Sequence, residues 1–198
     1  SGAALDVFID EPAHENILFG HENVIVTPHL GASTFEAQEN VSIQVAEQIS
    51  DYLLEGSIEN ALNMPSISRE DAPKLKPFLE LVRQISSFLG QLTGFEVKKF
   101  IIEFNGVVAS LNVHPLTSVA LEGVFKYGMD SINMVNAPSI IRDRGVEIIE
   151  TINEKSKQYS STIKLIVEGN GIKKSVEGVV FENGIPRVIE VNGIRIEA

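Results

Sequence analysis

Apolar residues recur at two different spacings along the chain, and each spacing predicts a different kind of element. Over residues 34–55 they fall three to four residues apart, which gives a helix one apolar face, at Val41, Val45, Ile49, Tyr52 and Leu53. Gly56 then suits the end of that helix. The same spacing predicts a second helix from Leu75 or Pro77 to Leu92.

Beyond residue 95 the pattern becomes mixed. Polar and apolar positions alternate over 96–104, which predicts a strand, and Asn105-Gly106 is a strong turn pair. A helix is expected over 116–127. Another should begin at Pro138, with Asn136 as its cap, and stop at Gly145.

The last quarter of the chain predicts strand after strand, over residues 146–152, 162–168, 173–181 and 186–196. The turns between the last of these are Gly169-Asn170-Gly171, Asn183-Gly184 and Asn192-Gly193. Hairpins favour such residues because they accept a positive φ. The second part of the chain is therefore expected to be an α+β domain with a mainly antiparallel sheet.

Two short apolar runs near the start predict strands over 3–8 and 24–26. The segment 65–77 holds three prolines among serines and charges, which indicates a linker. We therefore expect a first part over 1–64, a linker over 65–77 and a second part over 78–198.

Composition narrows the classes of partner. The 198 residues carry a net charge of −11, which argues against nucleic acid or an acidic membrane surface. There is no cysteine, so a disulfide framework and a cysteine metal site are excluded. The sequence has no apolar run long enough to span a bilayer, and its four histidines show no metal-ligand spacing.

The stretch 27–36, with the sequence TPHLGASTFE, places His29 between the end of a strand and the start of a helix. Pro28 restricts the turn before the ring, and Gly31 allows the backbone to come close to a ligand. Ser33 and Glu36 have the spacing of a capping box, so the helix should begin there. The alternative is an ordinary strand–loop–helix joint with a surface histidine.

The opening ALDVFIDEP and the segment NVIVTPHLGAST resemble the end of the nucleotide-binding domain in D-isomer-specific 2-hydroxyacid dehydrogenases. Within that family the second segment is similar to the D-3-phosphoglycerate dehydrogenase group. The resemblance implies an α/β fragment, the end of a Rossmann-type NAD domain with its return helix. It implies that Glu11 and His29 are catalytic. It also implies that Asp6 and the backbone of His29, Leu30, Gly31 and Ala32 contact the cofactor, NAD.

The chemistry asked of such residues is simple. Oxidation of a 2-hydroxy acid moves a hydride to the nicotinamide and a proton to a base, and a neutral imidazole suits that role near pH 7. A carboxylate on the other ring nitrogen fixes the tautomer and stabilises the imidazolium. His29 would be the acid/base and Glu11 its orienting partner. The alternative for Asp6 and Glu11 is a solvated strand end.

The sequence also departs from that family. It contains no Gly-x-Gly-x-x-Gly loop after a first strand, and the family's substrate-binding arginine belongs upstream of the matching segment. We therefore expect a C-terminal portion that is inactive alone. Two alternatives stay open: a ligand-binding or oligomerisation module without catalysis, and another 2-hydroxyacid dehydrogenase.

A second resemblance lies further along. The segments MVNAP, RDRGV and IEVNGIRI resemble the intervening, allosteric substrate-binding domain of some members, without the terminal ACT domain. An effector anion could use Asn136, Arg142 and Arg144, and Lys155 and Lys157 could approach it after folding. The alternative is that these are solubilising charges.

The resemblance further implies partners and a compartment for the parent enzyme. Its substrate would be a small phosphorylated hydroxy acid, oxidised in L-serine biosynthesis. The parent is expected to be a cytoplasmic homo-oligomer, a dimer or a tetramer. No metal, nucleic acid or membrane is expected.

Overall fold

The computed structural model describes residues 1–156, 158–181 and 184–196. Contacts within the chain divide it into two compact units, Ser1–Ser50 and Asp51–Ala198. Lys157, named above as a cation that could approach the effector site, and Asn183, predicted to be in a hairpin turn, lie outside the described residues. No helix in the described part of the chain is long and apolar enough to cross a membrane.

The first unit is built on two short strands. β1 (Ala3–Leu5) and β2 (Val24–Val26) pair in parallel, with Leu5 opposite Val26. The predicted strand over 3–8 therefore ends three residues early, whereas the prediction over 24–26 is confirmed. Parallel pairing puts the carboxyl ends of both strands at one edge, which is where an α/β fold places its functional loops.

Helix α1 (Phe35–Glu55) follows these loops. Thr34 Oγ1 accepts a hydrogen bond from the N–H of Ala37 at 3.1 Å, so Thr34 caps the helix. The predicted Ser33–Glu36 capping box is therefore wrong, because the residue in the cap position is one further along. At the other end Gly56 has a φ of 77° and its N–H donates to the carbonyl of Tyr52, which confirms the predicted stop.

The apolar face predicted for α1 is exposed. None of the helix residues is buried, and Val41, Ile49 and Leu53 are 47%, 55% and 73% exposed. The spacing of apolar residues predicted the helix correctly. The same spacing does not say which part of the protein, if any, contacts the apolar face of α1.

The second unit is a six-stranded sheet in the order β4-β3-β5-β6-β7-β8. The strands are β3 (Lys99–Gly106), β4 (Glu147–Asn153), β5 (Ser161–Gly169), β6 (Ile172–Val180), β7 (Pro186–Val191) and β8 (Ile194–Arg195). Every pair is antiparallel except β3 with β4. The predicted α+β domain with a mainly antiparallel sheet is confirmed.

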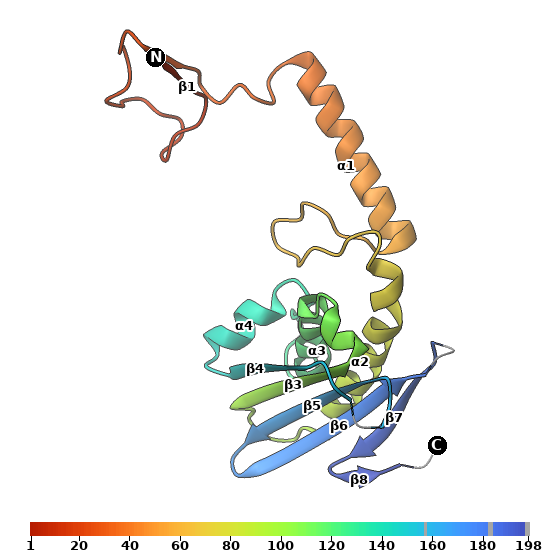
Figure 1. Ribbon diagram of the computed structural model, residues 1–198. Helices are drawn as coiled ribbons and strands as arrows, with labels where there is room; N and C mark the ends of the chain where they lie inside the picture. The colour runs from red at the N-terminus through yellow and green to blue at the C-terminus, as the bar shows by residue number, and fades with distance from the viewer. Residues whose placement is uncertain (157, 182–183, 197–198) are drawn as a thin grey trace. The chain divides into compact units, whose positions relative to one another are not determined.

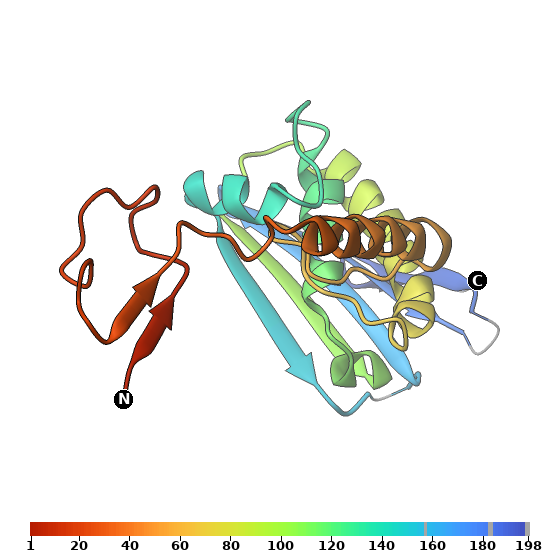
Figure 2. The same ribbon diagram turned by 90° about the horizontal axis from the view of Figure 1, so that it is seen from above.

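Helices cover one face of this sheet, as Figures 1 and 2 show. They are α2 (Ala72–Leu92), α3 (His114–Phe125) and α4 (Ala137–Asp143), with a short 3-10 helix η1 (Val107–Ser110) after β3. The alternation of β3 buries Phe100, Ile102 and Phe104, and α2 packs Leu81 and Ile85 into the same fully buried core. Burying these side chains supplies most of the free energy that holds the unit together.

Two predictions in the second unit need correction. Helix α2 begins at Ala72, so residues 72–77 of the predicted linker are helical. Pro73 lies in the first turn, where a missing N–H costs little. Asn105-Gly106 does not form a hairpin turn, because both residues still pair with β5 and the chain bends at Gly106, whose φ is 81°.

Apart from residues 72–77, which belong to α2, the division into 1–64, 65–77 and 78–198 stays a prediction. Two of the predicted hairpin turns are confirmed. Asn170-Gly171 and Asn192-Gly193 have positive φ and join antiparallel strands.

Candidate active site

The ends of β1 and β2 bring two acidic residues to one histidine. Asp6 directly follows β1 and Glu11 lies in the loop beyond it, while Thr27 directly follows β2 and precedes Pro28 and His29. Because Leu5 and Val26 are register partners, the residues after them emerge side by side. The structure therefore brings together residues that are 18 to 25 positions apart in the sequence.

Glu11 and His29 form a hydrogen-bonded pair. Glu11 Oε2 contacts His29 Nδ1, and Glu11 Oε1 accepts a hydrogen bond from the N–H of Phe8 at 2.8 Å. Both carboxylate oxygens are therefore fixed, and the imidazole is oriented by its Nδ1 edge. Within the described part of the chain Nε2 makes no hydrogen bond, so it is the ring nitrogen that can meet a ligand, and the side chain of His29 is 61% exposed.

The pair shifts the proton affinities of both groups. The hydrogen bond and the charge of Glu11 raise the pKa of His29 above 6.5. The N–H of Phe8 and then the hydrogen bond to His29 lower the pKa of Glu11 below 4.5. Between these two pKa values the pair exists as carboxylate and imidazolium, and above the pKa of His29 the ring is a free base.

The carboxylate of Asp6 is hydrogen-bonded to groups of the protein itself. Its carboxylate accepts hydrogen bonds from Thr27 Oγ1 at 2.5 Å, from Leu30 N–H at 2.6 Å and from Gly31 N–H at 2.8 Å. A Cβ at Gly31 would lie 3.3 Å from Asp6 Oδ2, so the glycine permits this close approach. The sequence predicted that Gly31 lets the backbone come close to a ligand. In the structure the group that the backbone approaches there is the carboxylate of Asp6. Ala32 is exposed beside it.

A cavity of about 410 Å³ opens beside the pair. Phe8, Phe19, Val26 and Pro28 give it apolar walls, and Glu11, Thr27 and His29 supply its polar groups. Phe8 and Phe19 meet edge to face with ring centroids 5.4 Å apart. An apolar hollow with a few converging polar groups and a base at its rim suits a small ligand that gives up a proton.

Of the residues predicted for an effector anion, Asn136 uses its side chain within the protein. The side-chain oxygen of Asn136 accepts the N–H of Asn133 at 2.8 Å, and its NH2 donates to the carbonyl of Ser131 at 2.9 Å. The Asn136 side chain therefore ties down the preceding loop and makes no cap for α4. Arg142 and Arg144 are exposed, and neither makes an ion pair within the described residues.

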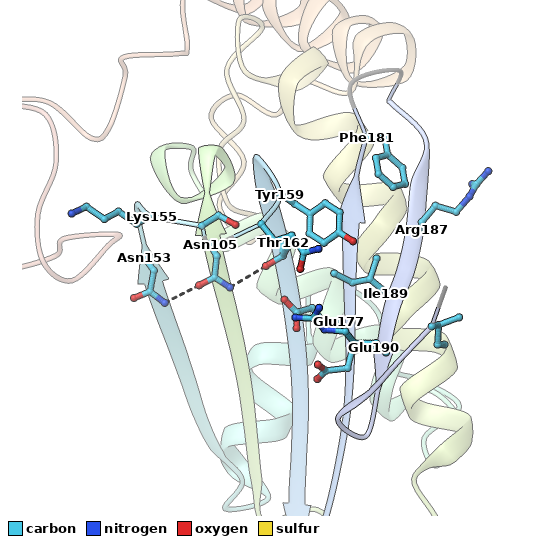
Figure 3. Close-up of a pocket in the computed structure, with 14 residues that line it drawn as sticks. Asn105, Asn153, Lys155, Tyr159, Thr162, Glu177, Phe181, Arg187, Ile189 and Glu190 are labelled. Carbon is cyan, nitrogen blue, oxygen red and sulfur yellow. Dashed lines mark hydrogen bonds between the residues drawn. The ribbon is translucent and has the colours of Figure 1, made fainter. Parts of the chain in front are cut away.

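A larger cavity of about 830 Å³ lies in the second unit, on the strands β3 to β8. Figure 3 shows Asn105 between Asn153 and Thr162, to which it is hydrogen-bonded at 2.9 Å and 3.2 Å. Lys155 and Arg187 extend away from this row at opposite sides of the cavity. Glu177 and Glu190 share Lys164, whose Nζ lies 3.4 Å and 2.5 Å from their oxygens.

Sequence reasoning missed this row of polar residues. Asn105 was interpreted as part of a turn because Asn-Gly is a local turn signal. Its partners Asn153 and Thr162 are 48 and 57 residues away, and only the sheet register joins them. The one available signal was the alternation of 96–104, which continues to Asn105 on the polar side.

Comparison with known proteins identifies the family. The family model of the D-3-phosphoglycerate dehydrogenase intervening domain matches residues 74–192. D-3-phosphoglycerate dehydrogenase of Synechocystis is 38% identical over 96% of this chain, and that of Bacillus subtilis 34% over 100%. The enzyme of Methanocaldococcus jannaschii is 35% identical over 98%. The chain spans 35%, 38% and 37% of these relatives' own lengths. By the match of residues 74–192, the chain belongs to the D-3-phosphoglycerate dehydrogenase intervening domain family.

Proposed function

We propose that this chain is part of an NAD-dependent dehydrogenase that oxidises 3-phospho-D-glycerate to 3-phosphohydroxypyruvate. The observation that carries the proposal is the Glu11–His29 pair at the rim of the apolar cavity. Relatives named D-3-phosphoglycerate dehydrogenase, similar over nearly the whole chain, support the choice of substrate.

His29 takes the proton in this proposal. With Nδ1 held by Glu11, Nε2 accepts the proton of the substrate's C2 hydroxyl while the hydride leaves C2. Glu11 stabilises the imidazolium that results, because its carboxylate is already hydrogen-bonded to the ring. In the reverse direction the same imidazolium returns the proton to the carbonyl oxygen.

NAD fits the residues beside His29. When bound, it accepts the hydride. The apolar walls from Phe8, Phe19 and Pro28 suit a flat ring, and Asp6 orders the backbone from Leu30 to Gly31 next to them. The sequence holds no Gly-x-Gly-x-x-Gly loop for the pyrophosphate, so this chain supplies only part of the cofactor site.

The test is NAD reduction by the full-length parent enzyme. We expect turnover with 3-phospho-D-glycerate and much weaker turnover with D-glycerate and D-lactate, which lack the phosphate. A preference for an unphosphorylated hydroxy acid would point to another 2-hydroxyacid dehydrogenase. No NAD reduction with any of the three would leave the non-catalytic module as the better account.

The 198-residue chain alone should neither turn over substrate nor bind the cofactor tightly. A fluorescence titration with NADH measures this directly. Tight binding by the chain alone would contradict the view that its cofactor site is partial.

We also propose that the second unit is regulatory and binds an anionic effector, with Arg142 and Arg144 as its cations. Their exposure and lack of ion pairs among the described residues leave them available. Titration of the chain with inorganic phosphate, followed by NMR, tests this. The proposal is supported if phosphate changes the chemical shifts near Arg142 in the wild type but not in Arg142→Gln/Arg144→Gln. Equal shifts in both proteins contradict it.

The parent enzyme is proposed to be a cytoplasmic homo-oligomer, a dimer or a tetramer, in L-serine biosynthesis. Light scattering on the full-length enzyme gives its subunit number. A monomer at working concentration would contradict this part of the proposal.

A further inference from the structure

Thr27 and Asp6 are joined at the carboxyl ends of the two parallel strands. The N–H of Thr27 donates to the carbonyl of Leu5 at 3.0 Å, which continues the pairing of β1 and β2 by one residue. The hydroxyl of Thr27 then donates to Asp6 Oδ1 at 2.5 Å. The side chains that first emerge from the strand pair are therefore hydrogen-bonded to each other.

The same carboxylate holds the loop on the other side of His29. Oδ1 of Asp6 also accepts the N–H of Leu30, and Oδ2 accepts the N–H of Gly31. Thr27 precedes His29 by two residues, and Leu30 and Gly31 follow it directly. The three hydrogen bonds therefore fasten the chain before and after His29 to one fixed group.

His29 has a backbone conformation that needs such support. Its φ is 58°, in the left-handed region that residues with a Cβ rarely adopt. Among the described residues its side chain makes one hydrogen bond, to Glu11 in an exposed loop, so the ring alone does not hold the loop. The Asp6 carboxylate fixes the backbone on which the ring is mounted.

We propose that Thr27 is a positioning residue that acts through Asp6 to hold His29 against Glu11. The hydroxyl fixes Asp6 Oδ1, the carboxylate fixes the amides of Leu30 and Gly31, and the fixed amides keep His29 in its left-handed conformation. The consequence for catalysis rests on the proposed dehydrogenase function. The geometric role does not.

The lowered pKa of Asp6 agrees with this chain of contacts. The hydrogen bond from Thr27 is its largest cause, followed by the N–H of Leu30. The three hydrogen bonds to Asp6 use three of the roughly four acceptor positions of its carboxylate.

The test compares Thr27→Val with Thr27→Ser in the 198-residue chain by NMR. Valine keeps the shape of threonine and removes the donor, whereas serine keeps the donor. In Thr27→Val we expect the amides of Leu30 and Gly31 to exchange with water roughly tenfold faster, the effect of losing about one hydrogen bond. The pKa of His29 should fall toward 6.5, because the ring no longer stays on Glu11. Thr27→Ser should keep both values near those of the wild type.

Asp6→Asn provides a second variant. It keeps the size of the side chain and leaves a single acceptor oxygen, so the exchange of the Gly31 amide should accelerate as in Thr27→Val. Signals of His114 in the second unit serve as an internal control and should not move.

Unchanged exchange and an unchanged pKa of His29 in Thr27→Val would overturn the proposal. Loss of dispersed signals throughout residues 1–50 would also overturn it, because the hydroxyl would then support the whole unit. None of these readouts uses enzyme activity. The dehydrogenase assignment and the positioning role can therefore fail independently.

Discussion

The carboxylate of Glu11 contacts Nδ1 of His29, although the two residues are 18 positions apart in different loops. The N–H of Phe8 fixes the second oxygen of Glu11, so the carboxylate cannot rotate freely away from the ring. The contact sets the tautomer of His29 and raises its pKa. Both effects are what a general base in this position needs.

Replacing Glu11 by glutamine should alter the pH dependence of the parent enzyme. In the proposed reaction, oxidation needs His29 as a free base, so its rate should rise as the pH passes the pKa of His29. Glutamine removes the charge that raises this pKa, and the rising limb should move to lower pH. The maximal kcat should fall roughly 10²-fold or more, because the imidazolium loses its stabilising partner. The measurement is kcat and kcat/KM against pH, and an unmoved limb would rule out the Glu11 contact as the cause.

The first unit should be most stable between the two pKa values of this pair. The pKa of His29 is raised, so its contribution is complete below 6.5 and is lost as the pH rises through the pKa in the folded state. The pKa of Glu11 is lowered, so its contribution is complete above 4.5 and is lost as the pH falls through its folded value. Hydrogen exchange of residues 1–50 as a function of pH checks this. In Glu11→Gln the stability of the first unit should change less with pH, both above the pKa of His29 and below that of Glu11. An unchanged pH dependence in this variant would contradict the stabilising role of the pair.

Helices α2 and α3 approach closely at Gly123. A Cβ at this position would lie 1.9 Å from Ser86 Oγ and 2.7 Å from Ser86 Cβ. Gly123→Ala should therefore destabilise the second unit by about 1–3 kcal/mol, measured by chemical denaturation. Ser86→Gly in the same chain should recover part of that loss, because it removes the clashing atoms. Gly94→Ala is the matched control, since among the described residues, apart from its two chain neighbours, no atom lies within 4 Å of its added Cβ. Equal effects of Gly123→Ala and Gly94→Ala would refute the close packing.

Lys164 separates two glutamates on neighbouring strands. Glu177 and Glu190 are register partners, and each has an oxygen near Lys164 Nζ. Burial lowers the pKa of Lys164, but the hydrogen bonds and charges of both glutamates outweigh it and raise the pKa. Lys164→Met should cost on the order of 1–3 kcal/mol, because two half-buried carboxylates would face each other.

Adding Glu177→Gln to Lys164→Met should recover part of this cost, and acid should narrow the gap to the wild type. Additive losses in this double-mutant cycle would show that the three charges do not interact. Lys76→Met, on an exposed side chain of α2, serves as the control.

Local sequence patterns predicted the helices and strands better than they predicted what these elements contact. The spacing of Val41, Val45 and Ile49 predicted α1 within one residue, and the positive-φ pairs at 170–171 and 192–193 predicted two hairpins. These signals lie within a few residues of the element they describe. The start of α2 was missed because Pro73 resembles a linker residue, although the first helical turn tolerates it.

Long-range contacts were less accessible from the sequence. The roles of Glu11 and His29 were inferred from a family resemblance, and the structure adds that the two side chains touch. For Asp6 the sequence predicted a contact with the cofactor. It did not predict that the carboxylate accepts hydrogen bonds from the N–H groups of Leu30 and Gly31. The row of Asn105, Asn153 and Thr162 depends on sheet register, which residue types alone do not fix.

The most direct test of the central claim is kcat for NAD reduction by the full-length parent enzyme carrying His29→Asn, with 3-phospho-D-glycerate as substrate. His14→Asn is the matched control, since this exposed histidine lies in the same unit and outside the cavity. We predict that kcat falls about 10²- to 10⁴-fold in His29→Asn, with a much smaller change in KM, and stays near the wild-type value in His14→Asn. A kcat of His29→Asn within a fewfold of the wild type would contradict the role of His29 as the acid/base.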